Sequence, residues 1–111
     1  MRALVTIAGL VALAACGEPL GKKPMLAGCE AAAAALRPEV ADVPLDYRAV
    51  VGREAILRYR LPDGSGDPHV LNVKCKVNFG GALTRIKIDS VRARDGDHEA
   101  AKAAFAAAVR P

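Results

Sequence analysis

Residues 71–79 alternate strictly between apolar and polar side chains. Successive side chains of a β-strand point to opposite faces of a sheet, so this pattern predicts a strand over 69–79 that is buried on one face only. The inward positions are Leu71, Val73, Cys75, Val77 and Phe79. A chain with such a strand has to build a sheet with one apolar face and one polar face.

Neighbouring segments supply the other strands. Residues 44–61 predict an extended region that is broken at Gly52, and its second half alternates again. Residues 83–91 predict a further strand. The turn cluster over 63–68 and the pair Gly80-Gly81 separate these segments by short connections, which favour antiparallel pairing. We therefore expect a small antiparallel sheet of three to four strands.

Two alanine-rich segments predict helices at the ends of the domain. The first covers 26–37 and stops before Pro38, with an apolar stripe of Leu26, Cys29, Ala33 and Leu36. The second covers 99–109, with Ala101, Phe105 and Ala108 or Val109 on its inner side. The expected fold class is α+β, with the sheet flanked by an N-terminal and a C-terminal helix that cover one face.

The N-terminus has the pattern of an export signal. Arg2 gives a positive start, an apolar stretch follows over 3–13, and small residues precede Cys16. The ending Leu13-Ala14-Ala15-Cys16 resembles the lipobox of bacterial lipoproteins.

That resemblance implies a signal peptide over 1–15, removed on processing, and a lipid attached to Cys16 that holds the protein on a membrane. Gly17 stands where an aspartate often signals retention at the inner membrane in these proteins, so it implies the outer membrane, facing the periplasm. A flexible, lipidated tether over 16–25 and a single domain over 26–111 would follow.

Three cysteines are an awkward number for an exported protein, because one is left without a partner. Assigning Cys16 to the lipid leaves Cys29 and Cys75, which an oxidising periplasm would pair as a disulfide. Both residues are expected to face the same core. The alternative is a metal or catalytic thiol, although the chain has no Cys-x-x-Cys motif and neither histidine stands at ligand spacing from either cysteine.

The residues that could carry catalysis are few. Ser65 and Ser90 are the only serines, and neither lies in a Gly-x-Ser-x-Gly setting. The acidic segment Asp95-Gly96-Asp97-His98-Glu99 is best explained as the capped start of the last helix. The alternative is a small periplasmic hydrolase or metal-binding protein that uses Asp95 to Glu99. We expect no enzymatic activity, no cofactor and no metal.

One surface carries a strong charge pattern. Six cationic residues fall on the outward parity of the expected strands: Arg58, Arg60, Lys74, Lys76, Arg85 and Lys87. Such a face attracts anionic partners, and an anionic envelope component or an acidic protein fits an exported domain. Nucleic acid is not expected, because the face lacks interleaved aromatic residues. A charged face kept only for solubility is the alternative.

The remaining segments give a second, weaker resemblance. Cys29-Glu30, Leu36-Arg37-Pro38, Pro44 and Asn78-Phe79-Gly80-Gly81-Ala82 look like small exported bacterial proteins of unknown function. That likeness implies no activity. The sequence thus predicts a lipid-anchored periplasmic domain that binds or scaffolds in the cell envelope.

Overall fold

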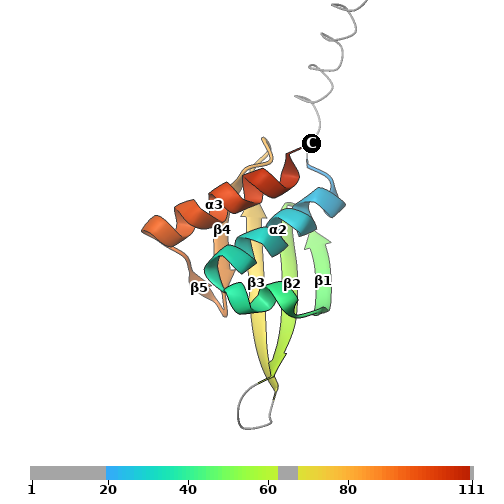
Figure 1. Ribbon diagram of the computed structural model, residues 1–111. Coiled ribbons are helices and arrows are strands. Elements are labelled where there is room, and N and C mark those ends of the chain that lie inside the picture. The colour runs from blue at the N-terminus through green and yellow to red at the C-terminus, as the bar shows by residue number, and fades with distance from the viewer. Residues whose placement is uncertain (1–19, 63–67, 111) are drawn as a thin grey trace, which may run out of the picture.

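A computed structural model describes residues 20–62 and 68–110 of the chain. Two long helices and five strands make up these residues, with one short 3₁₀-helix after the first helix (Figure 1). In chain order the elements are α2 (Lys22–Leu36), η1 (Pro38–Asp42), β1 (Leu45–Val51), β2 (Glu54–Pro62), β3 (Pro68–Val77), β4 (Leu83–Ile88), β5 (Val91–Arg92) and α3 (Asp95–Val109). The α+β class is confirmed, but the sheet of the described residues has five strands where three to four were expected.

All five strands pair antiparallel in the order β1-β2-β3-β4-β5, so each strand lies beside its neighbour in sequence. The predicted break at Gly52 is the β1–β2 turn, where this residue has a φ of 62° that a glycine adopts easily. The predicted strand over 83–91 is instead two strands. Asp89 and Ser90 turn the chain with φ values of 51° and 69°, so Ser90 is an exposed turn residue rather than part of a strand.

Both helices lie on the same side of the sheet and pack against each other (Figure 1). Between the layers lies a core of fully buried side chains that includes Leu57, Val73, Ile86 and Phe105. The ring of Phe105 lies directly over Gly28 of α2, in space that the side chain of any other residue at position 28 would fill.

The expected disulfide is present. Cys29 of α2 is bonded to Cys75 of β3, with 5.8 Å between their Cα atoms and a sequence separation of 46 residues. Both cysteines are fully buried. The bond therefore joins the helical layer to the middle strand of the sheet.

Both helices begin four residues earlier than predicted. Pro24 is accommodated in the first turn of α2, because the first N–H groups of a helix have no partner within the helix. Met25 then takes the buried position expected for Leu26, which is half-buried. The inward position expected for Phe79 is also wrong: β3 ends at Val77, and Phe79 is 73% exposed.

Several expectations lie outside the described residues. These are the signal peptide over 1–15, the lipid-bearing Cys16 with Gly17, the first part of the tether and the turn over 63–67. Within the described ranges, no helix is long and apolar enough to cross a membrane.

Candidate anion-binding face

The outer face of the sheet carries all six of the predicted cations, because the strands keep the predicted parity. Their inward neighbours Leu57, Tyr59, Val73, Cys75 and Ile86 are buried. No helix of the described part of the chain covers the outer face, since α2 and α3 share the other one. The cationic side chains are therefore directed to solvent.

The strand register brings four of the six cations together. Lys74 lies directly opposite Lys87, and Lys76 lies directly opposite Arg85. Side chains opposite each other in an antiparallel pair have Cβ atoms about 4.5–5.5 Å apart. We call Lys74, Lys76, Arg85 and Lys87 the four-cation cluster.

Like charges placed directly opposite each other destabilise a sheet. The two ion pairs found among the described residues involve none of the four cations. Glu54 is the register partner of Lys76 on the β2 side, but the two do not form an ion pair. The cluster thus keeps a net positive charge, since Glu54 is the acidic register partner of only one of its four cations.

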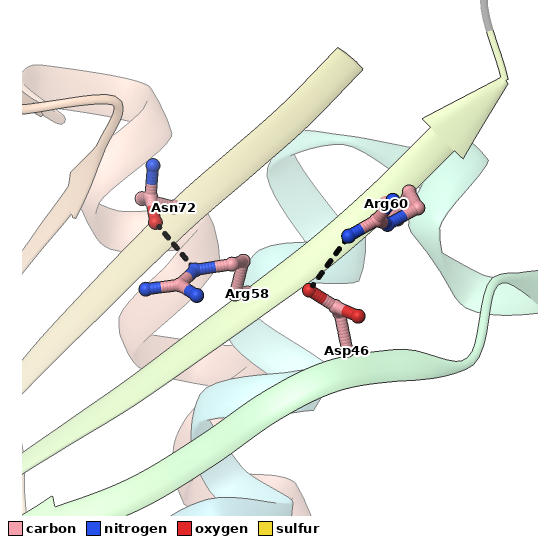
Figure 2. Close-up of polar contacts among 4 residues, drawn as sticks. All are labelled: Asp46, Arg58, Arg60 and Asn72. Atoms are coloured by element: carbon pink, nitrogen blue, oxygen red, sulfur yellow. Dashed lines mark hydrogen bonds and ion pairs between the residues drawn. The ribbon is translucent and has the colours of Figure 1, made fainter. Parts of the chain in front are cut away.

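The two arginines of β2 are in a different situation, as Figure 2 shows. The Arg60 Nη2 atom lies 3.6 Å from the Asp46 Oδ2 atom. The Arg58 Nε–H donates a hydrogen bond of 3.4 Å to the Asn72 side-chain carbonyl, and the Arg58 guanidinium lies 5.1 Å from the centre of the Tyr47 ring. These two cations have partners within the domain, so the strongest site is the cluster on β3 and β4.

An acidic residue marks one end of the face. Asp89 accepts a hydrogen bond of 3.0 Å from the Asn72 backbone N–H, and its carboxylate lies 3.8 Å from the His69 Nε2 atom. These contacts hold the β4–β5 turn against β3. The positive surface therefore ends at Asp89 along the direction of the strands. Across the strands, it continues from the four-cation cluster to β5.

One cation of the site was missed by sequence reasoning. Arg92 of β5 is the register partner of Lys87, so it continues the row that Lys74 and Lys87 begin. Strand β5 has only two residues, so it is too short to show the alternation of apolar and polar side chains that predicts a strand.

The acidic segment before the last helix has another structure than predicted. Residues 95–99 form the beginning of α3, whose N-cap is Arg94 with no side-chain capping hydrogen bond. The capping hydrogen bond expected from these acidic side chains is therefore wrong, whereas acidic residues in the first helical turn are confirmed by Asp95 and Asp97. Among the described residues, no three side chains of His, Cys, Asp or Glu gather as they would around a metal ion.

The chain matches no protein-family model, no curated protein and no solved structure.

Proposed function

We propose that this chain is a lipid-anchored lipoprotein of the bacterial cell envelope whose domain binds an anionic partner without catalysing a reaction. The lipobox-like ending at Cys16 supports the anchor. The observation that carries the binding function is the register of β3 and β4, which sets two like-charged pairs side by side on an open face. A surface kept only for solubility would gain as much from alternating charges, which would also stabilise the sheet.

Intact mass spectrometry of the protein extracted from membranes tests the anchor. We expect a mass that begins at Cys16, includes acyl chains, and gains a pair of hydrogens on reduction of the disulfide. A soluble, unacylated chain would contradict the proposed location.

Binding to a polyanion tests the role of the face. The full-length protein, kept in a neutral detergent, is titrated with fluorescently labelled inorganic polyphosphate and with labelled polyglutamate at rising salt. We expect binding that weakens steeply as the salt concentration rises. Salt screens the electrostatic contacts, and it also reduces the gain from the counterions that the polyanion releases on binding.

Two variants with equal charge make the test specific. The first replaces the four-cation cluster by glutamine. The control replaces four exposed cations elsewhere, namely Lys22, Lys23, Arg48 and Lys102, also by glutamine. We expect the first variant to lose most of the binding and the control to keep it. Equal losses in both would mean that net charge alone causes the attraction, and the proposal would fall.

A further inference from the structure

An open cleft of about 780 Å³ lies at the β5 edge of the sheet. Six charged side chains line it, and five of them are cationic. They are Arg37, Arg85, Lys87, Arg92, Arg94 and Asp97. We call this hollow the β5 cleft.

Four separate elements place these side chains around the same hollow. Arg37 follows the last residue of α2, and Arg85 and Lys87 come from β4. The Ala93 N–H donates a hydrogen bond of 3.0 Å to the Ile86 carbonyl, which extends the pairing of β5 with β4 and fixes the backbone between Arg92 and Arg94. The Arg94 carbonyl in turn accepts hydrogen bonds from the Asp97 and His98 N–H groups at the start of α3. Hydrogen bonds thus hold the backbone of residues 92–94 to β4 on one side and to the start of α3 on the other.

The lining has the chemistry of a phosphate site. Four of the five cations are arginines, whose planar guanidinium presents parallel N–H donors that match two oxygens of a phosphate group. None of the five takes part in an ion pair found in the described part of the chain. We propose that the β5 cleft binds a phosphate ester group of the anionic partner.

This assignment rests on the proposed function and deepens it, because Arg85 and Lys87 belong to both the four-cation cluster and the cleft. The cluster supplies long-range attraction to a polyanion, whereas the arginines of the cleft supply directional hydrogen bonds to one group. The cleft lies at the C-terminal end of α2. A phosphate ester can reach the cleft as a free or polymer-borne group, or as a lipid headgroup.

The test is an amide chemical-shift titration of the ¹⁵N-labelled full-length protein in neutral detergent micelles. Pyrophosphate and soluble glycerol phosphate are the first probes, and citrate is the carboxylate control. Phosphatidic acid mixed into the micelles then presents the same ester as a headgroup. Saturation by glycerol phosphate identifies a free or polymer-borne source, and saturation only by phosphatidic acid identifies a membrane source.

Three variants localise the site. In R92Q/R94Q we expect the affinity for pyrophosphate to fall by about tenfold or more, the loss that corresponds to one charge-assisted hydrogen bond. The control K23Q/K102Q removes equal charge from two exposed helical positions outside both the cleft and the four-cation cluster, and we expect it to keep the affinity within a few-fold. In D97N the only acidic side chain of the lining is neutralised, so binding should become tighter, a result that misfolding cannot produce.

The proposal predicts saturable shifts over 92–97 that citrate does not reproduce. Shifts that never saturate, or that citrate reproduces equally, would overturn the phosphate site. Equal losses in K23Q/K102Q and R92Q/R94Q would overturn the cleft, because net charge alone would then cause the attraction. Polyphosphate binding that survives loss of the cluster would instead contradict the proposed function.

Discussion

Gly28→Ala tests the packing of the two helices most sharply. A Cβ atom at position 28 would lie 2.6, 2.8 and 2.9 Å from three ring carbons of Phe105. Carbon atoms pack best at about 3.5–4.0 Å, so the ring and α2 would have to separate by about 1 Å. The ring is fully buried, and protein interiors are close-packed, so turning the ring away would displace other core side chains.

Two effects of opposite sign compete in this variant. Alanine is favoured over glycine within a helix by about 1 kcal/mol. Overpacking a tight core costs about 1–3 kcal/mol. Because a backbone-near Cβ meets a buried ring rather than a flexible chain end, we expect the packing term to win. The free energy of unfolding should fall by up to about 2 kcal/mol, which lowers the Tm by several degrees for a domain of this size.

Urea unfolding of four proteins isolates the cause: the unchanged protein, Gly28→Ala, Phe105→Leu and the double variant. Phe105→Leu removes the Cε2 and Cζ atoms, two of the three that the new Cβ would meet. In that background Gly28→Ala should cost less or even stabilise. Gly96→Ala is the matched control, because Gly96 is also helical and a Cβ there meets nothing within 4 Å. A more stable Gly28→Ala protein, or equal effects in both backgrounds, would refute the reasoning.

Three further predictions concern the disulfide, the charged face and the buried side chain of Tyr59. Replacing both disulfide cysteines by alanine should lower the free energy of unfolding by about 4 kcal/mol, measured in urea, since the bond closes a loop with a sequence separation of 46 residues. Lys87→Glu would place opposite charges across from Lys74 and should stabilise the sheet by up to about 1 kcal/mol while weakening polyanion binding; Lys102→Glu, with the same charge change, should do neither. Burial, and secondarily the charge of a nearby glutamate, raises the pKa of Tyr59 to about 12. The native state then keeps a proton that the unfolded chain releases. The contribution of Tyr59 to the free energy of unfolding is therefore complete below the ordinary pKa of about 10. It is lost as the pH rises from there to about 12, and the loss is on the order of 2 kcal/mol. The pKa of Tyr59 is measured from the tyrosinate absorbance of the Tyr47→Phe variant, in which Tyr59 is the remaining tyrosine.

The alternation of β2 and β3 was readable from the sequence because each strand has one buried and one open face. That period also predicted the outward position of the six cations and the inward position of Cys75. Which cations become neighbours was not readable, since it depends on strand register. The register separated Arg58 and Arg60, with their partners Asn72 and Asp46, from the four-cation cluster.

The features that sequence reasoning missed arise from local geometry without a strong residue signal. The β4–β5 turn places Ser90 at positive φ, where glycine or asparagine is the usual signal, so β5 and Arg92 were not expected. Gly21 begins α2 without a side-chain cap, and burial of Met25 by the tertiary fold supports that first turn instead. The close approach of the Phe105 ring to Gly28 depends on how α2 and α3 pack against each other. These helices are far apart in the sequence, so no local sequence pattern predicts this contact.

The inner and outer faces of the sheet have different roles, so a substitution can change the binding of an anion without lowering the free energy of unfolding. The inner face holds the buried core and the disulfide. The register gives the four-cation cluster two like-charged pairs that oppose folding and one opposite-charge pair, Lys76 with Glu54, that favours it, so the repulsion outweighs the attraction. Replacing these cations by glutamine removes that repulsion and leaves the core untouched. The variant should therefore unfold at the same urea concentration as the unchanged protein, or at a higher one, even as its affinity for a polyanion falls. A loss of binding together with a loss of stability would mean that the outer face supports the fold, and the case for a surface kept for a partner would fail.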